Sequence, residues 1–368
     1  MTFDQEGRIL GMIKKQQKET IYILAPYLFH GGAEKQLRYL IQELIFFNYQ
    51  ICLHVLANTS RQDVRRAFPD AADGSIQLVS YGVDVLSLRK NPHVWLYVLC
   101  RLLVGMRSSR IVYMYSVYFI PIIPALKSLG KKTIYSERIF SPKVKKRSFL
   151  YRVASLCDRF VVNSDSLEEY FGKRFGNVVL VRNKVDPIIW NCPGPPCPPY
   201  SIAIISRYDP LKNIGFALNA LGFKEERVIN VYGVGDKEYI RKMKNLAGNL
   251  SATIKINNTV PIGYIYQNSD IVIHPSLAEG TSNVLLEAMI SRKPIIVSSI
   301  RENIDTGIHA DCIFDPSDPK SLCDTLDRWE GMSGDRREKI LDFNEMAVSE
   351  RYGPAPFRDA VAKIFKFQ

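Results

Sequence analysis

Two glutamates in the segment HPSLAEGTSNVLLEAM, Glu279 and Glu287, are separated by seven residues and stand on either side of a glycine-containing loop. A strand ending at His274 leads into this loop. A helix is expected to begin near Thr281 or Ser282, because serine and threonine favour the N-cap position. Backbone amides at such a helix start face an anion, and the helix dipole adds partial positive charge there. The amides concerned are those of Gly280, Thr281, Ser282, Asn283 and Val284.

The two carboxylates add a second kind of recognition to this loop. A carboxylate accepts hydrogen bonds well from vicinal hydroxyls, so one glutamate can bind a sugar and the other a ribose. His274 stands at the strand end, where a structural hydrogen bond is the favoured role for a histidine. From the residues alone, a capped helix with two surface glutamates explains the same segment equally well.

Two basic residues, Arg207 and Lys212, lie in the segment ISRYDPLKN at the end of another expected strand. An arginine and a lysine placed there can converge on a diphosphate, and neutralising such a leaving group lowers the barrier to its departure. Seen in isolation, a pair of surface cations is the alternative.

Glycine pairs mark two further strand ends. Gly31 and Gly32 lie in YLFHGGAEKQL, and Gly233 and Gly235 lie in VYGVGD. Glycine allows the backbone to approach a ligand closely. Neither pair identifies a ligand by itself.

The elements that must position these groups are strands of parallel sheets. Short apolar runs alternate with helix-like segments along the chain. The predicted strands are TIYILAPY, ICLHVLA, RIVYMYS, KTIYSE, RFVVNS and VVLVRN, then YSIAIISR, RVINVYG, ATIKIN, DIVIHPS and PIIVSS. Runs that are apolar throughout indicate an α/β protein whose sheets are covered on both faces. Ligands of such sheets bind beyond the carboxyl ends of the strands, where the groups above are expected.

A proline-rich segment, DPIIWNCPGPPCPPY, interrupts this alternation. Prolines make a stiff, extended connector, and 368 residues are enough for two domains. We therefore expect an N-terminal Rossmann-like domain over residues 1–185, a linker over 186–200, a C-terminal Rossmann-like domain over 201–350 and a last helix over 351–368 that crosses back to the first domain. The cleft between the domains is the expected binding site.

The composition is that of a globular protein, with 46% hydrophobic and 23% charged residues. The sequence shows no apolar signal core and no apolar segment of the roughly 20 residues that span a bilayer. The apolar stretch 93–110 is expected to be a buried helix, with membrane contact as the second reading. Seven scattered cysteines lack the spacing of a zinc site, so reduced thiols in a cytoplasmic protein are expected.

The net charge of +12 favours a negatively charged partner over a merely solvated basic surface. Basic and apolar residues interleave in KVKKRSFLYRVASL, residues 143–156, as in an amphipathic helix on an anionic membrane. The sequence lacks the alternating basic and aromatic residues of nucleic-acid-binding modules. A non-catalytic nucleotide or nucleic-acid binder therefore remains only a distant alternative.

The segment HPSLAEGTSNVLLEAM resembles the E-x7-E signature of glycosyltransferase family 4, retaining enzymes of the GT-B fold. Other segments agree with that family in order and spacing over nearly the whole chain: HGGAEKQ, NSDSLEEYF, VRNKVD, SRYDPLKN, VYGVGD and IFDPSDPKSLCDTL. The resemblance implies two Rossmann-like, doubly wound parallel-sheet domains facing across a cleft. It also implies transfer of a sugar, with retention, from a nucleoside-diphosphate sugar that is expected to be UDP-linked.

The resemblance further implies a role for each motif. Arg207 and Lys212 correspond to the residues that bind the diphosphate, and Glu279 to the residue that contacts the donor sugar. The implied donor site also includes the ribose ligand Glu287, the amides of Gly280, Thr281, Ser282, Asn283 and Val284, and the glycines Gly31, Gly32 and Gly233. The family requires no metal and no cofactor beyond its substrates. The family is expected to react by front-face attack assisted by the leaving phosphate. The resemblance therefore implies no nucleophile from the protein.

Two positions depart from the family pattern. The usual Asn-Gly before the linker reads Asn183-Lys184, which leaves that turn less defined. A histidine common in the first domain is absent, and SERIF places Glu137 and Arg138 there. This resembles members that build bacterial surface polysaccharides of the O-antigen or capsule type on lipid-linked acceptors, so both residues become acceptor-side candidates. A buried, salt-bridged glutamate is the alternative for Glu137.

The combined expectation is a peripheral enzyme on the inner face of the cytoplasmic membrane. Its partners would be a nucleotide sugar, a lipid-linked or saccharide acceptor and an anionic membrane surface. An enzyme acting on a soluble small-molecule or protein acceptor is the competing reading.

Overall fold

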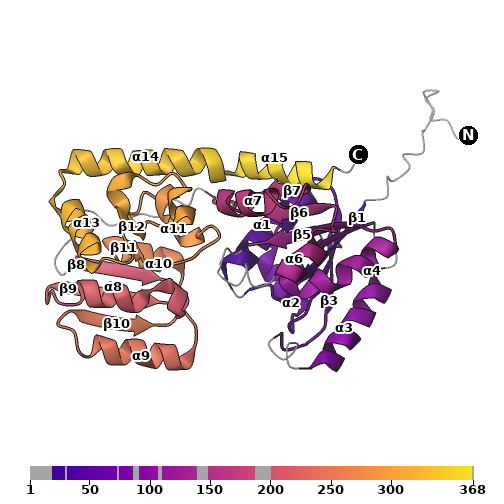
Figure 1. The fold of residues 1–368 in the computed structure, drawn as a ribbon, viewed down its shortest axis with the longest axis horizontal. Helices are drawn as coiled ribbons and strands as arrows, with labels where there is room; N and C mark the ends of the chain where they lie inside the picture. Colours follow the sequence, from indigo (N-terminus) through magenta and orange to yellow (C-terminus); the bar gives the residue numbers. More distant parts are fainter. Residues whose placement is uncertain are drawn as a thin grey trace, which may run out of the picture. The chain divides into compact units, whose positions relative to one another are not determined.

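The computed structural model describes residues 19–29, 31–72, 74–85, 91–106, 110–138, 148–186 and 200–366. The chain divides into two compact units, Met1–Phe29 with Leu37–Thr133, and His30–Gln36 with Ile134–Gln368. Figure 1 shows the helices and strands. Almost all of the predicted linker, residues 187–199, lies outside the described residues, so the domain boundary placed there stays a prediction.

The first sheet is parallel and has seven strands in the order β3-β2-β1-β4-β5-β6-β7. The strands are β1 (Thr20–Ala25), β2 (Gln50–Val55), β3 (Ile76–Ser80), β4 (Ile111–Met114), β5 (Lys132–Glu137), β6 (Arg159–Val162) and β7 (Val178–Leu180). The inner strands β1 and β4 are apolar and buried throughout except for Thr20, as expected of strands covered on both faces. Every predicted strand of this half is present, and β3 at the edge was not predicted.

Helices connect the strands of this first sheet. They are α1 (Gly32–Phe46), α2 (Arg61–Ala67), α3 (Pro92–Gly105), η2 (Val117–Ile122), α4 (Ile123–Ser128), α6 (Ser148–Ala154) and α7 (Asp165–Gly172). The expectation of a buried helix near residues 93–110 is only half right. Helix α3 buries Val98 and Leu102, but Leu96, Tyr97 and Val104 are more than half exposed.

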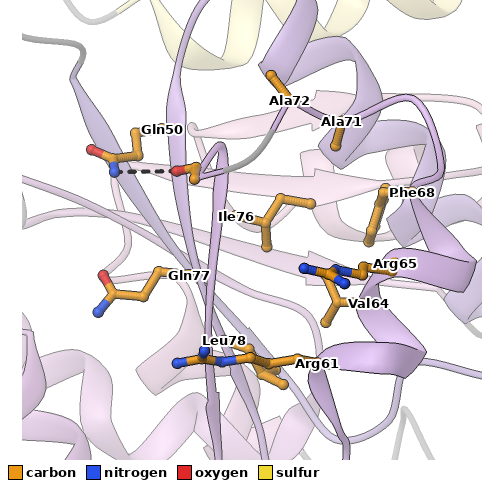
Figure 2. Close-up of a pocket in the computed structure, with 11 residues that line it drawn as sticks. Gln50, Arg61, Val64, Arg65, Phe68, Ala71, Ala72, Ile76, Gln77 and Leu78 are labelled. Carbon is orange, nitrogen blue, oxygen red and sulfur yellow. Dashed lines mark hydrogen bonds between the residues drawn. The ribbon is translucent and has the colours of Figure 1, made fainter.

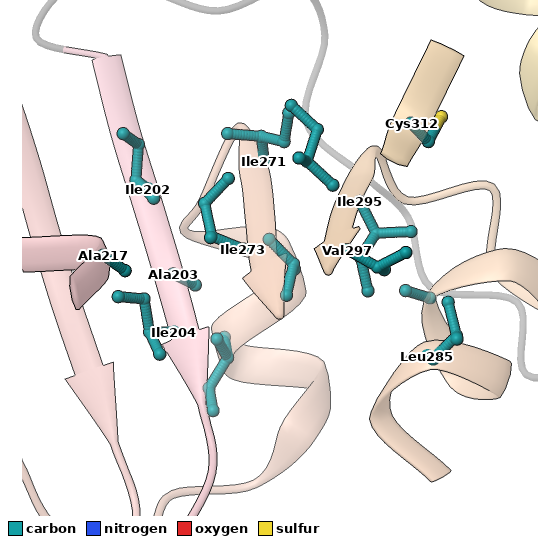
Figure 3. Packing of buried hydrophobic residues seen from close by; sticks show 14 of the residues in the cluster. Ile202, Ala203, Ile204, Ala217, Ile271, Ile273, Leu285, Ile295, Val297 and Cys312 are labelled. Atoms are coloured by element: carbon teal, nitrogen blue, oxygen red, sulfur yellow. The ribbon is translucent and has the colours of Figure 1, made fainter. Parts of the chain in front are cut away.

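The second sheet is also parallel, with six strands in the order β10-β9-β8-β11-β12-β13. These are β8 (Tyr200–Ile205), β9 (Arg227–Tyr232), β10 (Thr253–Asn257), β11 (Ile271–His274), β12 (Ile295–Ser298) and β13 (Ile313–Phe314). Isoleucine and valine side chains of the central strands form the core, together with Leu285 from a neighbouring helix (Figure 3). The strand order reverses between β8 and β11, and this reversal is where an open α/β sheet places its ligand.

The remaining helices are η3 (Pro210–Lys212), α8 (Ile214–Leu221), α9 (Lys237–Ala247), α10 (Ile262–Gln267), α11 (Asn283–Ile290), α12 (Arg301–Ile304), η4 (Ala310–Cys312), α13 (Pro319–Gly331), α14 (Gly334–Tyr352) and α15 (Pro354–Phe365). Helix α8 packs against α9 and α13, and α11 packs against α14. In the described part of the chain, no helix is long and apolar enough to cross a membrane.

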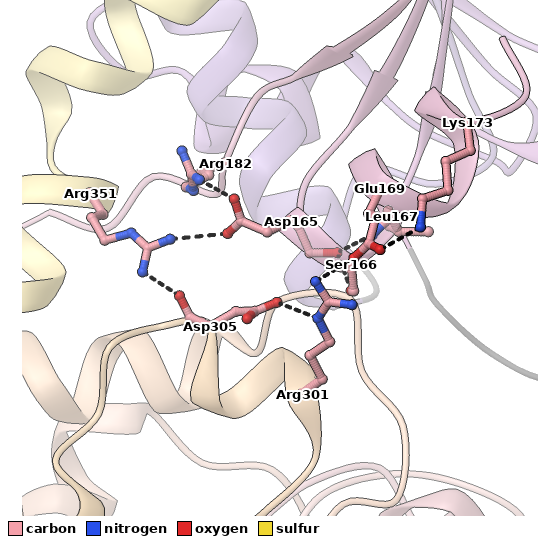
Figure 4. Close-up of polar contacts among 10 residues, drawn as sticks. Asp165, Ser166, Leu167, Glu169, Lys173, Arg182, Arg301, Asp305 and Arg351 are labelled. Carbon is pink, nitrogen blue, oxygen red and sulfur yellow. Dashed lines mark hydrogen bonds and ion pairs between the residues drawn. The ribbon is translucent and has the colours of Figure 1, made fainter.

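Charged side chains join the end of α14 to the start of α7 (Figure 4). Asp165 accepts hydrogen bonds from Arg182 and, at 3.0 Å, from Arg351. The backbone N–H of Val185 also donates to the carbonyl of Tyr352 at 2.9 Å. The end of α14 therefore contacts the segment around residues 165–185. That the last helix crosses back to a separate N-terminal domain stays a prediction.

Candidate functional site

The loop that follows β11 carries the predicted anion-binding amides. Ser282 is the N-cap of α11, because its Oγ accepts a hydrogen bond from the N–H of Leu285 at 3.4 Å. The N–H groups of residues 280–284 have no hydrogen-bond acceptor within the described ranges. Five unsatisfied donors at the start of a helix form a site for an anionic ligand.

Glu279 lies next to these amides and is ionised. Its Oε1 is 2.5 Å from Nζ of Lys212 and 3.2 Å from Nε2 of His274, and all three side chains are nearly buried. Burial alone would raise the pKa of Glu279, but His274 and Lys212 outweigh that effect and lower its pKa to about 2. The predicted sugar-contacting carboxylate is thus a fixed negative charge.

Local structure brings Lys212 to this carboxylate. Asp209 caps η3 by accepting from the N–H of Leu211 at 2.9 Å, and the carbonyl of Leu211 accepts from the N–H of Leu277 at 2.8 Å. The loop after β8 is thereby joined to the loop after β11. Nε2 of His274 is buried 3.2 Å from Oε1 of Glu279, without the alignment of a regular hydrogen bond, so the structural hydrogen bond expected of this histidine stays a prediction.

Two glycines of the site lie so close to other residues of the chain that a side chain would not fit without a shift. A Cβ on Gly280 would overlap the carbonyl oxygen of Arg138 and press on Oδ1 of Asn163, and a Cβ on Gly32 would overlap the side chain of Asn283. These glycines allow the loop before α11 and the start of α1 to approach their neighbours.

Arg207 and Gly233 lie at the ends of β8 and β9. A Cβ on Gly233 would overlap the carbonyl oxygen of Ser206, so this glycine lets two strand-end loops meet. The side chain of Arg207 is exposed, and it forms no ion pair with the residues that the structure describes. Its cation is therefore available to a ligand, whereas that of Lys212 is paired with Glu279.

Glu287 has a partner that the sequence did not suggest. Lys35 of α1 donates to Oε1 of Glu287 at 2.5 Å, and the side chain of Glu287 is only 9% exposed. Beside this ion pair, Nδ2 of Asn283 donates to the carbonyl of Gly32 at 2.8 Å, and Gln36 donates to Oδ1 of Asn283 at 3.0 Å. The start of α1 is therefore bound to the start of α11.

Asn183 forms the centre of a further amide network. Its Nδ2 donates to the carbonyl of Thr281 at 3.0 Å and to Oδ1 of Asn283 at 2.9 Å, and its Oδ1 accepts from Arg138 at 2.9 Å. Lys184 stands where the family usually has glycine. Its backbone N–H donates to Oε1 of Gln36 at 2.7 Å, and its carbonyl accepts from Nε2 of Gln36 at 2.8 Å. These bonds define the turn that the sequence left less defined.

Glu137 is buried, and its carboxylate already accepts several hydrogen bonds. The hydroxyls of Tyr135 and Tyr151 donate to Oε2 at 2.9 and 2.7 Å, and the N–H of Arg138 donates to Oε1 at 3.0 Å. Burial, followed by the nearby carboxylate, raises the pKa of Tyr135. This arrangement is close to the alternative of a buried, structural glutamate, except that tyrosine hydroxyls donate to the carboxylate.

Elsewhere, a pocket of about 490 Å³ lies between α2 and β3 (Figure 2). It is lined by apolar side chains such as Val64 and Phe68, together with Arg61 and Arg65, and contains none of the predicted site residues. No cluster of three or more metal-ligating side chains occurs in the ranges that the structure describes.

Comparison with known proteins agrees with the predicted fold. Residues 199–329 match the family model of Glycosyl transferases group 1, which contains both Arg207–Lys212 and Glu279–Glu287. With a TM-score of 0.76, the chain resembles the crystal structure of Anabaena Alr3699/HepE in complex with UDP-glucose, at 15% identity over 94% of this chain and 98% of that chain. The prediction of two parallel-sheet α/β domains of the GT-B fold is confirmed.

Two curated relatives match over shorter stretches. The chain is 30% identical over 151 residues to "Putative glycosyltransferase EpsF" of Bacillus subtilis (strain 168), which is 38% of each protein. It is 31% identical over 68 residues to mannosylglucosylglycerate synthase of Thermotoga maritima, which is 17% of this chain and 16% of that protein. The matches span less than two fifths of either relative. The predicted resemblance to group 1 glycosyltransferases is confirmed over residues 199–329, which the family model matches.

Proposed function

We propose that the protein is a glycosyltransferase that uses a nucleoside-diphosphate sugar as donor. The observation that carries this proposal is the cluster of five N–H groups at residues 280–284, which have no acceptor among the described residues and lie beside the ionised carboxylate of Glu279. The amides suit the phosphate oxygens of the donor, and the carboxylate suits sugar hydroxyls. The match of residues 199–329 to group 1 glycosyltransferases supports the same conclusion.

The basic residues give this site a way to assist departure of the nucleotide. Lys212 is held at the carboxylate of Glu279, and Arg207 at the end of β8 is exposed and unpaired within the described ranges. When the bond between sugar and phosphate breaks, negative charge develops on the diphosphate. Cations and N–H groups fixed in advance stabilise that charge. The reaction is a sugar transfer with retention at the anomeric carbon and needs no metal ion.

The donor is proposed to be UDP-linked, as in the resemblance that the motifs indicate and in the UDP-glucose bound to HepE. The first test is a thermal-shift screen of UDP-, GDP-, ADP- and TDP-sugars, because a cognate donor stabilises the fold by mass action. Stabilisation by UDP-sugars alone is the expected result. Stabilisation by none of them refutes the proposed function. NMR of the anomeric proton of the product tests retention, and unchanged turnover in EDTA tests metal independence.

Site variants test the assigned roles. Glu279→Ala and Lys212→Ala should each remove most turnover while circular dichroism still reports a folded protein. Lys173→Ala is a matched control, because Lys173 forms an exposed ion pair with Glu169 at 2.7 Å outside the site. Near wild-type turnover in either site variant would contradict the assignment.

The acceptor is proposed to be a lipid-linked saccharide of a surface polysaccharide, reached at the cytoplasmic face of a membrane. Residues 143–147 of the predicted basic helix lie outside the described residues. In the described part, Phe149 is 74% and Leu156 54% exposed, and Arg152 is exposed beside them. Exposed apolar side chains next to cations suit an anionic lipid surface. Glu137 and Arg138 remain the acceptor-side candidates.

Vesicle sedimentation separates this acceptor from a soluble one. The protein should sediment with vesicles containing phosphatidylglycerol at low salt and remain in the supernatant with phosphatidylcholine alone. Phe149→Ser with Arg152→Gln should weaken the binding. If the wild-type protein stays in solution with anionic vesicles, a soluble acceptor is the better account.

A further inference from the structure

The start of helix α1 is bound to the first turns of helix α11 by three side-chain contacts. Lys35 donates to Glu287 at 2.5 Å, Gln36 donates to Asn283 at 3.0 Å, and Asn283 donates to the carbonyl of Gly32 at 2.8 Å. The partners are 247–252 residues apart in sequence. Such contacts fix Lys35 relative to the carboxylate.

Only one oxygen of Glu287 is used in this arrangement. Lys35 binds Oε1, and Oε2 forms no hydrogen bond with the residues that the structure describes, although it is not sealed from solvent. The side chains of Lys35 and Glu287 are 25% and 9% exposed. An ion pair offsets the desolvation of a carboxylate that is this buried. Lys35 supplies the cation of this pair and leaves Oε2 open to a ligand.

We propose that Lys35 is a positioning residue for the nucleoside of the donor, acting through Glu287. It holds Oε1 of the carboxylate and so turns Oε2 toward the vicinal hydroxyls of a ribose. This inference rests on the proposed function, because it takes Glu287 as the ribose ligand. Lys35 and the ribose then bind different oxygens of one carboxylate at the same time.

A competing geometry makes a different prediction. If the ribose had to displace Lys35 from Glu287, removal of the ammonium group would free the carboxylate and strengthen nucleotide binding. If Lys35 positions the carboxylate, its removal weakens nucleotide binding. Only the part of the binding free energy that depends on the ribose hydroxyls should then be lost. The sign of the change therefore separates positioning from competition.

The experiment is calorimetric titration of the full chain with UDP and with its 2′-deoxy and 3′-deoxy analogues. A hydrogen bond from a hydroxyl to a carboxylate contributes enough for the wild-type protein to prefer UDP by roughly tenfold. In Lys35→Met this preference should fall to about twofold or less, and Lys35→Arg should restore most of it. The donor KM should rise more than kcat falls, since Lys35 acts on binding.

Lys173→Met is the matched control. It removes a lysine from an ion pair with Glu169 that is largely exposed and distant in sequence from the site residues. UDP affinity and the preference for UDP over its deoxy analogues should be unchanged in this variant. Glu287→Gln should lose the preference to the same extent as Lys35→Met, and the double variant should lose no more.

The outcomes separate this inference from the proposed function. If UDP binds the wild-type protein and Lys35→Met keeps the full preference for UDP, or binds UDP more tightly, the positioning role is refuted and the proposed function stands. If no nucleoside diphosphate binds the wild-type protein, both fail. Thermal unfolding of Lys35→Met, Glu287→Gln and the double variant then still reports whether the two side chains interact.

Discussion

Replacing Lys212 by methionine should destabilise the protein in a way that depends on pH. The change removes the ammonium group 2.5 Å from Oε1 of Glu279 and leaves a side chain of similar length, so the carboxylate remains nearly buried without that cation. The pKa of Glu279 is about 2 in the folded protein and 4.5 for the unperturbed group. That difference corresponds to about 3 kcal/mol of stability at neutral pH, to which Lys212 and His274 contribute together.

The sign of the pH dependence follows from the depressed pKa. In the wild-type protein the contribution of Glu279 is complete above pH 4.5 and is lost as the pH falls toward 2. Without Lys212, only His274 opposes the effect of burial, so the pKa of Glu279 rises and the carboxyl group is more easily protonated. Lys212→Met should therefore lose about 2 kcal/mol at pH 7.5, nearly as much at pH 5, and clearly less near pH 3.

Urea denaturation followed by tryptophan fluorescence measures this effect, because Trp329 is buried in the core of the sheet that carries both residues. The double variant Lys212→Met/Glu279→Gln removes both charges and should recover a large part of the loss. Equal losses at pH 3 and pH 7.5, or additive losses of the two single variants, would refute the reasoning that the carboxylate depends on Lys212.

Three further outcomes are expected elsewhere in the molecule. Gly280→Ala should lower stability by about 2 kcal/mol and weaken nucleotide binding, because the new Cβ overlaps a backbone carbonyl. Gly331→Ala is the control, because the space there is open, and it should change neither quantity. Thermal shift and calorimetry measure the two effects. Burial lowers the pKa of His54 from 6.5 to about 4, so its contribution is complete above pH 6.5 and lost as the pH falls toward 4. His54→Gln should accordingly show a smaller fall in Tm between pH 7 and pH 4.5 than the wild-type protein. Asp165→Asn removes the charge shared by two half-exposed arginines and should lower stability by about 1 kcal/mol, measured as a small fall in Tm that shrinks in high salt.

The fold was predictable because most strands carry their own signal. Strands such as β1 and β11 are continuous apolar runs, which buried parallel strands require. The edge strand β3 was missed for the opposite reason. It is only partly buried, its sequence IQLVS contains two polar residues, and it follows an Asp-Gly pair that is typical of turns. Its assignment depends on pairing with β2, which no local pattern shows.

The loop and helix start at residues 275–284 were predictable from residue types, and the distant side chains that contact α11 were not. A glycine followed by threonine and serine indicates a helix start, and the structure places the cap at Ser282. In contrast, Lys35 looks like an ordinary helical lysine, and Glu287 is 252 residues away along the chain. The amide network of Asn183 could not be predicted either, because its hydrogen bonds to residues 138, 281 and 283 depend on how distant segments of the chain meet.

The two lysines resolve an electrostatic difficulty that the sequence motif creates. Glu279 and Glu287 would together repel the diphosphate that we propose the neighbouring amides to bind. Each carboxylate is instead paired with its own lysine, Lys212 at 2.5 Å and Lys35 at 2.5 Å, so the pairs carry no net charge. What remains is the partial positive charge of the start of α11 and the cation of Arg207, which forms no ion pair with the residues that the structure describes. The carboxylates can therefore recognise hydroxyls by hydrogen bonding without opposing the phosphates, which explains why a site for an anion contains two acidic residues.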